Sequence, residues 1–316
     1  MVVQPITASV EGTPLVIHTV QELRTWRAEQ RKLGKRVGLV PTMGALHEGH
    51  LALVQSARNE CDVVVVSIFV NPAQFAPHED LAQYPRTLTQ DVQRLSAASG
   101  ENDGKPLADV VLAPAVAEMY PSGITVQKEQ QQGAFVEVVG LSHQMEGVTR
   151  PHFFRGVATV VTKLFNIVQP DVAFFGQKDA QQCVVVKALV RDLCFPIRIV
   201  VVPTVRDSTS ALALSSRNKY LTADQRHLAT TLYRGLQAAE VLFSQGECQR
   251  DALLEAVNSS FTSNTEAEVE LEYLSLAHPT TLEELDRIEA DGAILSGAFR
   301  VGTTRLIDNV LLGCTL

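Results

Sequence analysis

An almost continuous run of β-branched and aromatic residues between Asp62 and Val70 constrains the fold of this 316-residue chain more than any other stretch. Such a run is typical of a strand covered on both faces, as in a parallel sheet. A second strand is predicted to begin at Val37, and the residues between the strands carry apolar side chains at helical spacing. Strand, helix and strand in this order predict a βαβ unit.

The same alternation continues through the first two-thirds of the chain and then changes. Helices are predicted at 20–33, 87–98, 156–168 and 180–193, and strands at 110–112, 172–175 and 197–202, which together indicate an α/β domain with a parallel sheet. Residues 122–148 are predicted to form a strand-rich excursion. After residue 204 helices are predicted at 223–245 and 249–260, then strands at 269–276, 293–301 and 305–310. We therefore expect an α/β domain over 1–204 and a smaller α+β domain over 205–316.

Composition narrows the classes of function. The net charge of -8 argues against a nucleic-acid-binding protein, because such domains are normally basic. The five cysteines contain no Cys-x-x-Cys pair, so reduced thiols are expected rather than a disulfide framework or a zinc site. No signal peptide is expected at the first residues and no apolar run is long enough to span a bilayer. We expect a cytoplasmic protein that binds neither nucleic acid nor membrane.

The stretch from Val37 to His50 is predicted to be a buried strand, a glycine-containing turn and the start of a helix. Free backbone N–H groups and a partial positive charge make a helix N-terminus a natural phosphate site. His47 and His50 stand at this helix start, where they could donate hydrogen bonds to a phosphoryl group. Their three-residue spacing does not match the His-Glu-x-x-His zinc pattern. Two histidines that only cap the helix are the alternative.

Three further groups of polar residues could carry chemistry. Gly176-Gln177-Lys178-Asp179 follows a predicted strand and could contact a nucleotide, although a surface turn is the better explanation of this segment taken alone. Leu214-Ser215-Ser216-Arg217-Asn218 could bind phosphate from a closing loop, or simply cap the next helix. The amides of Asn71, Gln74 and Gln182 suit hydroxyl and carboxylate groups, with turn bonding as the alternative for Asn71 before Pro72.

Three common signatures are missing from the sequence. It contains no Gly-x-x-x-x-Gly-Lys-Ser/Thr, no Gly-x-Gly-x-x-Gly after a strand and no Gly-x-Ser-x-Gly. A P-loop is therefore excluded by the sequence, a Ser–His–Asp triad cannot be argued from it, and no dinucleotide-binding fingerprint is found.

Five motifs follow one another along the chain. They are Pro41-Thr42-Met43-Gly44-Ala45-Leu46-His47-Glu48-Gly49-His50, Phe69-Val70-Asn71-Pro72-x-Gln74-Phe75, Tyr84-Pro85-Arg86-Thr87, Phe175-Gly176-x-Lys178-Asp179-x-Gln181-Gln182 and Leu214-Ser215-Ser216-Arg217-Asn218-x-Tyr220-Leu221. Taken together and in this order, they resemble the pantoate–β-alanine ligase family. The resemblance runs from about residue 16 to Asn309, where Gly302-Thr303-Thr304-Arg305-Leu306-Ile307-Asp308-Asn309 also matches.

The resemblance implies a reaction and an architecture. Pantoate and ATP would give pantoyl adenylate and pyrophosphate, and β-alanine would then attack the acyl carbon and release AMP. It also implies a homodimer, a Rossmann-type domain with a smaller C-terminal lid, and a magnesium ion with Asp91 as its carboxylate.

The resemblance also implies roles for individual residues, according to the motif in which each lies. His47, His50, Lys178 and Arg217 would act in catalysis, and Gln74, Gln182, Asn71 and Arg150 would bind pantoate or β-alanine. The ATP contacts would be Met43, Gly44, Ala45, Leu46, His47, Glu48, Gly49, His50, Gly176, Gln177, Lys178, Asp179, Val205, Leu214, Ser215, Ser216 and Arg217.

Several positions depart from the family pattern. Gln177 replaces a usual Glu, Ala180 an aromatic residue and Phe153 a His, the loop over 207–214 is longer, and 99–107 is an insertion. None removes a predicted phosphate contact, so we expect an active enzyme. Two other functions stay open at this point: a nucleotidyltransferase that uses a phosphorylated acceptor, and a nucleotide-binding module that has lost catalysis.

Overall fold

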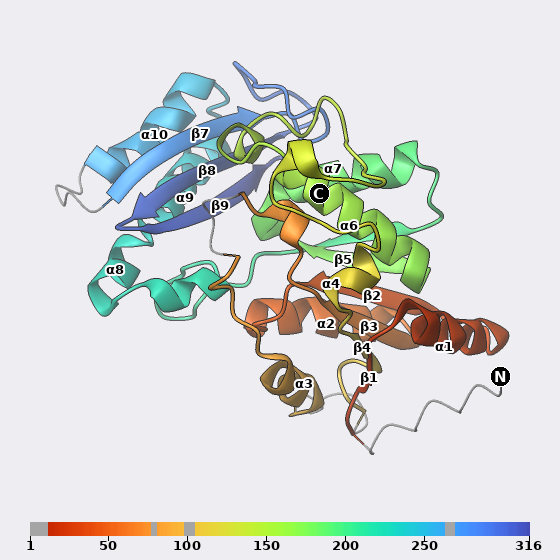
Figure 1. Ribbon diagram of the computed structural model, residues 1–316. Helices are drawn as coiled ribbons and strands as arrows, with labels where there is room; N and C mark the ends of the chain where they lie inside the picture. The colour runs from red at the N-terminus through yellow and green to blue at the C-terminus, as the bar shows by residue number, and fades with distance from the viewer. Residues whose placement is uncertain (1–11, 77–80, 98–104, 263–268) are drawn as a thin grey trace. The chain divides into compact units, whose positions relative to one another are not determined.

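The computed structural model describes residues 12–76, 81–97, 105–262 and 269–316 (Figure 1). The chain forms two compact units. Unit 1 contains the described residues up to 138 together with 150–175 and 185–202, and unit 2 contains 139–149, 176–184 and 203–316. One unit boundary, at 202/203, lies beside the domain boundary expected from the sequence. The segments 139–149 and 176–184, however, pack with the C-terminal part of the chain.

Unit 1 is built on a six-stranded sheet with the strand order β1-β4-β3-β2-β5-β6. The pairs β1–β4, β4–β3, β3–β2 and β2–β5 are parallel. The chain adds strands on one side of β2 and then returns to its other side, which makes the β2–β5 boundary the switch point where ligands bind in open α/β sheets. The strands are β1 (Leu15–Ile17), β2 (Val37–Thr42), β3 (Val63–Ile68), β4 (Val110–Leu112), β5 (Val172–Gly176) and β6 (Arg198–Val202).

The core of unit 1 confirms the prediction that the central strands are covered on both faces. Val40, Val64 and Val66 pack with the apolar side of helix α2 (Glu48–Glu60) in one cluster. Leu39 and Val65, which alternate with them and therefore point to the opposite face, are also fully buried. Burial on both faces explains why the sequence of β3 is a run of apolar residues rather than an alternating pattern.

The helices of the first 200 residues agree with the sequence at most positions. Helix α6 begins at Phe153, three residues before the predicted start, and the short elements β1 and α4 were not predicted. None of the helices in the described ranges is both long and apolar enough to cross a bilayer. The helices are α1 (Val20–Lys32), α2 (Glu48–Glu60), α3 (Leu88–Ala97), α4 (Val116–Met119), α5 (Glu146–Thr149), α6 (Phe153–Val168) and α7 (Ala180–Asp192).

The prediction of a strand-rich excursion over 122–148 is wrong. This stretch contains the 3-10 turn Lys128–Gln130, the start of α5 and irregular loops, and none of its residues belongs to a strand. Gly123, Gly133 and Gly140 all have positive φ, a conformation that interrupts an extended chain. Weak alternation of apolar residues indicates a strand only when a neighbouring strand is available to pair with it.

Unit 2 contains the antiparallel sheet β7–β8–β9, with β7 (Val269–Ala277), β8 (Ala293–Val301) and β9 (Thr304–Leu312). Helices α9 (Thr231–Ser244) and α10 (Arg250–Thr262) pack on one face of it (Figure 1). The predicted single helix over 223–245 is wrong: α8 (Ala223–Leu228) ends and α9 begins anew. The Thr230 hydroxyl donates to the His227 carbonyl at 2.8 Å, a local bond that competes with helix continuation.

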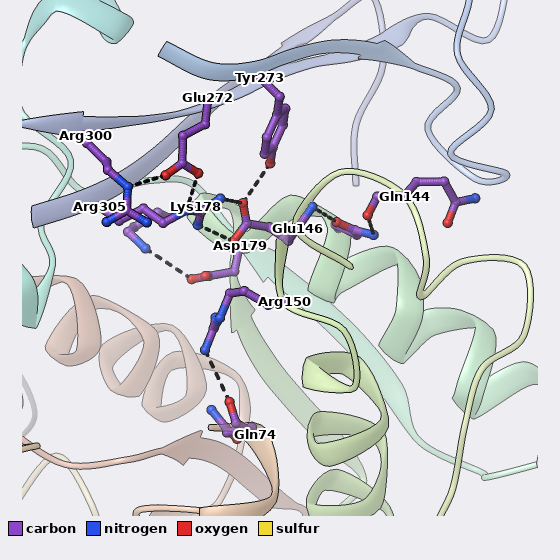
Figure 2. Close-up of polar contacts among 11 residues, drawn as sticks. Gln74, Gln144, Glu146, Arg150, Lys178, Asp179, Glu272, Tyr273, Arg300 and Arg305 are labelled. Carbon is purple, nitrogen blue, oxygen red and sulfur yellow. Dashed lines mark hydrogen bonds and ion pairs between the residues drawn. The ribbon is translucent and has the colours of Figure 1, made fainter. Parts of the chain in front are cut away.

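Strand β9 presents different residues to its two faces. Leu306 and Val310 join the core formed with α9 and α10, whereas Leu311 packs with Met145 and Ala180 on the other face. On that second face Arg305 makes a bidentate ion pair with Glu146, with both N–O distances 2.7 Å (Figure 2). Glu146 also accepts a hydrogen bond from the Tyr273 hydroxyl at 2.9 Å. The segments 139–149 and 176–184 therefore form a third layer of unit 2.

Candidate functional site

The turn that follows β2 in unit 1 has a defined backbone. The Thr42 hydroxyl donates to the Ser67 carbonyl at 2.7 Å and accepts the backbone N–H of Gly44 at 3.1 Å. Gly44 has φ +85°, and a Cβ there would lie 3.0 Å from Ile68 and 3.1 Å from the Asp91 carboxylate. Both the conformation and the close contacts therefore call for glycine at this position.

Asp91, on α3, binds the backbone of the same turn. Its Oδ2 accepts the N–H of Ala45 at 3.0 Å and its Oδ1 accepts the N–H of Leu46 at 2.8 Å. Oδ2 also accepts the Thr87 hydroxyl at 3.1 Å, and the residue is 2% exposed. Ala45 has φ +50°, which is uncommon for a residue other than glycine and needs surrounding contacts to hold it. Asp91 supplies those contacts.

The two histidines lie at the start of α2, as the sequence predicted. His47 is the N-cap residue and His50 lies in the first turn, with ring centroids 4.0 Å apart. The backbone N–H of His47 donates to Nδ1 of His50 at 3.3 Å. Because Nδ1 is the acceptor, a neutral His50 ring carries its proton on Nε2 and can donate from there.

The other predicted members of this turn differ in exposure. Leu46 is buried in the core of unit 1, so only its backbone belongs to the turn surface. Glu48 is exposed and forms an ion pair with Arg94 at 3.5 Å. Met43 and Gly49 are half-buried.

A second group of residues follows β3 and contacts Met43, which belongs to the turn after β2. The Gln74 amide donates to the Met43 sulfur at 3.1 Å and accepts from the Asn71 amide at 3.1 Å. Asn71 also donates to the Gly156 carbonyl at 3.1 Å, while its Oδ1 accepts the Tyr120 hydroxyl at 2.6 Å and the N–H of Ala73 at 3.3 Å. Strands β2 and β3 are parallel neighbours, so the segments that follow them emerge at one edge of the sheet.

Asn71 is 1% exposed, and its amide is engaged on both sides by protein groups. The bond from the N–H of Ala73 is the turn bond given as the alternative for this residue, and the contact of Asn71 with substrate stays a prediction. Asn71 therefore orients Gln74. Burial raises the pKa of the Tyr120 hydroxyl, so it stays a donor to Asn71 over the physiological range.

Arg150 contacts the backbone of Gln74. Its Nη2 donates to the Gln74 carbonyl at 3.2 Å (Figure 2), and its guanidinium stacks over the Phe153 ring, 3.8 Å from the centroid. Phe153, one of the departures from the family pattern, thus holds this arginine through a cation–π contact. Gly156 packs against the same segment, because a Cβ there would lie 2.2 Å from the Ala73 carbonyl oxygen.

In unit 2 the predicted nucleotide segment 176–179 forms a 3-10 turn over Gln177–Asp179. Lys178 and Asp179 form an ion pair at 3.5 Å (Figure 2). Gln177 donates from its amide to Asn309 at 3.3 Å, and Ala180 is buried against Met145 and Leu282. Gln182 is half-buried on α7. The two substitutions at 177 and 180 are therefore packed into unit 2.

The segment 205–218 also forms a defined turn. The N–H of Leu214 donates to the Val205 carbonyl at 3.0 Å, and the Asn218 amide donates to the Ala213 carbonyl at 3.0 Å. Ser215 caps the 3-10 turn Ser216–Tyr220 by accepting the N–H of Arg217 at 3.3 Å. Ser215, Ser216 and Arg217 therefore lie in one capped turn, and their contact with phosphate stays a prediction.

The longer loop at 207–214 is organised by one carboxylate. Asp207 Oδ1 accepts hydrogen bonds from the hydroxyls and the backbone N–H groups of Thr209 and Ser210. These bonds, that from the Thr209 hydroxyl first, lower the pKa of the Asp207 carboxyl. Of the predicted insertion, residues 99–104 lie outside the described ranges.

The residues present do not fit a metal site built by the protein. Both oxygens of Asp91 already accept backbone hydrogen bonds, and its side chain is buried. Within the described ranges, no group of three or more His, Cys, Asp or Glu side chains is placed to hold a metal ion. The geometry gives Asp91 the role of holding the turn.

Sequence reasoning gave no role to Tyr120 or Gly156, and none to Asp308 or Asn309. Tyr120 sits beside Met119 and Pro121 in a stretch without periodicity, so the sequence carries no signal for its contact with Asn71. Asp308 and Asn309 belong to a quoted motif near the C-terminus, which was the available signal for them.

Comparison of the sequence with known proteins finds a matching family. The family model described as pantoate-beta-alanine ligase matches residues 15–311. Pantothenate synthetase from Chloroflexus aggregans is 52% identical over 297 residues, which cover 94% of this chain and 99% of that protein. The enzyme from Moorella thermoacetica is 48% identical over 94% of this chain and 98% of its own length.

Solved structures give the same result. The crystal structure of pantothenate synthetase from Thermus thermophilus has a TM-score of 0.82 and 43% identity, covering 95% of this chain and 99% of that chain. Pantoate-beta-alanine ligase from Francisella tularensis, complexed with beta-gamma ATP and beta-alanine, has a TM-score of 0.73 and 32% identity, covering 96% and 99%.

Proposed function

The chain belongs to the pantoate–β-alanine ligase family, and we propose that its His47–His50 turn stabilises the phosphoryl group of ATP while pantoate is adenylated. The enzyme is a ligase that joins pantoate to β-alanine, with ATP as a substrate, to form pantothenate. The observation that carries the proposal about the turn is the position of His47 at the N-cap of α2 and of His50 in its first turn, with the proton of a neutral His50 on Nε2.

We propose that the reaction proceeds in two displacements. A pantoate carboxylate oxygen attacks the α-phosphorus of ATP, and the bond to pyrophosphate breaks. The β-alanine amine then attacks the acyl carbon, and the bond to AMP breaks. Negative charge increases on the oxygens around phosphorus during the first displacement. Donors fixed in advance, such as the Nε2–H of His50 and the N–H groups at the start of α2, stabilise that charge.

Pantoate is proposed to bind at Gln74, because the amide of Asn71 and the sulfur of Met43 orient its side chain. An oriented amide can bind a hydroxyl or carboxylate without first losing side-chain freedom. The positive charge of Arg150 next to the Gln74 carbonyl supports the binding of an anionic substrate there. The ATP contacts proposed for Gly176–Asp179, Val205 and Leu214–Arg217, and the substrate contact of Gln182, stay predictions.

Magnesium is proposed to arrive with ATP, bound mainly by phosphate oxygens and water, because Mg²⁺ commonly keeps several waters and takes ligands from substrate phosphates. No step is assigned to Asp91 as a metal ligand. The homodimer and the cytoplasmic location also stay predictions, which light scattering of the purified protein and cell fractionation would test.

Omitting one substrate at a time tests the proposed reaction. Purified protein with ATP, magnesium and pantoate should release pyrophosphate in an amount comparable to the enzyme concentration, and AMP only after β-alanine is added. The protein incubated with ATP and β-alanine alone is the control and should release neither. ADP in place of AMP, or pyrophosphate that appears only when β-alanine is present, would contradict the adenylate intermediate.

A further inference from the structure

Asn309 in β9 is bonded to the predicted nucleotide segment 176–179. Its Nδ2 donates to the carbonyls of Gln177 and Lys178 at 2.9 and 3.0 Å, and its Oδ1 accepts the Gln177 amide at 3.3 Å. The residue is 2% exposed. The buried side-chain amide of Asn309 therefore holds two successive backbone carbonyls. They belong to a segment whose regular structure is a single 3-10 turn of three residues, Gln177–Asp179.

The neighbouring residue, Asp308, points to the opposite face of the strand and binds a second predicted segment. Its carboxylate accepts two hydrogen bonds from the Arg206 guanidinium, at 2.6 and 2.9 Å, and it is 6% exposed. The same guanidinium stacks over Tyr233, 3.4 Å from the ring centroid. Arg206 directly follows Val205, whose carbonyl bonds to Leu214. Asp308 thus holds the base of the loop that leads to Ser215.

We propose that Asp308 and Asn309 are positioning residues for ATP binding, each holding one nucleotide-contacting segment in place from one side of β9. This inference rests on the proposed function, which assigns ATP contacts to Gly176–Asp179 and to Val205–Arg217. Alternation of side chains along a strand explains why two adjacent residues can hold two segments that are far apart in sequence.

The hydrogen bonds made by these two residues require aspartate at 308 and asparagine at 309. Asn309 must donate to two carbonyls, which a carboxylate cannot do, and Asp308 must accept from a guanidinium, which an amide does less well. In Asn309→Asp the carboxylate would face two carbonyl oxygens, and both of those carbonyls would lose their donor. The side chain keeps its size, so the variant changes hydrogen bonding and charge rather than packing.

The experiment compares Asn309→Asp with Ser275→Ala. Ser275 is the matched control because it is a buried residue of the same sheet and loses a hydrogen bond to Glu284, with no bond to 176–179. ATP binding is measured by calorimetry, and amide hydrogen exchange of the peptide over 176–182 is measured without nucleotide. Loss of two buried hydrogen bonds should raise the ATP Kd of Asn309→Asp about tenfold or more and speed exchange over 176–182. Ser275→Ala should change neither.

A pH titration distinguishes positioning from a general loss of stability. A protonated carboxyl at position 309 can donate one hydrogen bond, so the ATP Kd of Asn309→Asp should improve relative to wild type as pH falls from about 8 to about 6. Loss of sheet stability alone would not give this direction. If Asn309→Asp does not fold, Asn309→Ser replaces it, because serine is neutral and keeps a donor on a shorter side chain; its ATP Kd should rise by a smaller factor.

Two results would overturn the inference: a folded Asn309→Asp protein with an unchanged ATP Kd, or a raised ATP Kd with no change in amide exchange over 176–182. Failure of the proposed function is a separate outcome, since wild-type protein would then form no pantothenate, whereas the exchange comparison needs no substrate.

Discussion

The backbone N–H of His47 donates to Nδ1 of His50 across 3.3 Å at the first turn of α2. This bond fixes which ring nitrogen of His50 carries the proton, because the acceptor nitrogen must be unprotonated. It also fixes the rotation of the ring, since the donor belongs to the backbone. A histidine side chain is thereby prepared as a donor before any substrate binds.

His50→Ala should lower kcat about 100-fold or more, because removal of one prearranged donor to a developing oxyanion has an effect of that order. The ATP Kd should change little, since the donor acts mainly in the transition state. His50→Gln, which keeps an N–H donor near the position of Nε2, should retain more activity than His50→Ala. Steady-state kinetics and calorimetry measure both. Equal losses in kcat and in ATP affinity would argue against the assigned role.

Asp91→Asn should lower kcat/KM for ATP about tenfold to a hundredfold, because an amide NH₂ would face one of the two backbone N–H groups of the turn. The magnesium concentration that gives half-maximal activity should be unchanged. Asp109→Asn is the matched control: Asp109 also accepts a backbone N–H, that of Val64 at 2.7 Å, at the start of β3. A raised magnesium requirement in Asp91→Asn, with activity restored by added magnesium, would show that Asp91 binds the metal.

Gly156→Ala should destabilise the fold by about 1–3 kcal/mol through overpacking, because the new Cβ would lie 2.2 Å from the Ala73 carbonyl oxygen. The displaced segment carries Gln74, so KM for pantoate should rise as well. Urea unfolding and steady-state kinetics measure the two effects. Asn166→Ala changes an exposed residue of the same helix and should alter neither quantity. If the Gly156→Ala protein is destabilised but its KM for pantoate is unchanged, the contact between Gly156 and Ala73 does not affect substrate binding.

Cys61 should be the slower of two cysteines to react with iodoacetamide in the native protein at about pH 8, because burial raises the pKa of its thiol to about 11. Cys194 is exposed and should react first; peptide mass spectrometry measures both.

The shift also predicts the direction of a stability change. Above the ordinary thiol pKa of 9.0 the unfolded chain releases the Cys61 proton while the folded chain keeps it until about 11. The free energy of unfolding should therefore fall as pH rises through this window. Cys61→Ala should show a smaller fall in urea unfolding. An equal fall in both proteins would mean that other groups cause it.

The sequence alone determined the regular elements and the family motifs. Helices and strands repeat an apolar side chain with a fixed period, so the αβ alternation through β6 and the three C-terminal strands could be read locally. The histidines at the start of α2 were predictable for the same reason, because strand, glycine and helix follow each other directly. The break between α8 and α9 was not, since it coincides with a local hydrogen bond from the Thr230 hydroxyl to the His227 carbonyl, which leaves no periodic pattern in the sequence.

Only the tertiary structure decided which side chains hold the site. Asp91 meets Ala45 from 46 residues away, and Asn309 meets Gln177 from 132 residues away. An aspartate in a first helical turn could bind a metal, cap a helix or hold a loop, and all three have the same local sequence. The choice depends on which backbone groups the packed fold brings within hydrogen-bond distance. Those distances are set by long-range packing, which has no period along the chain.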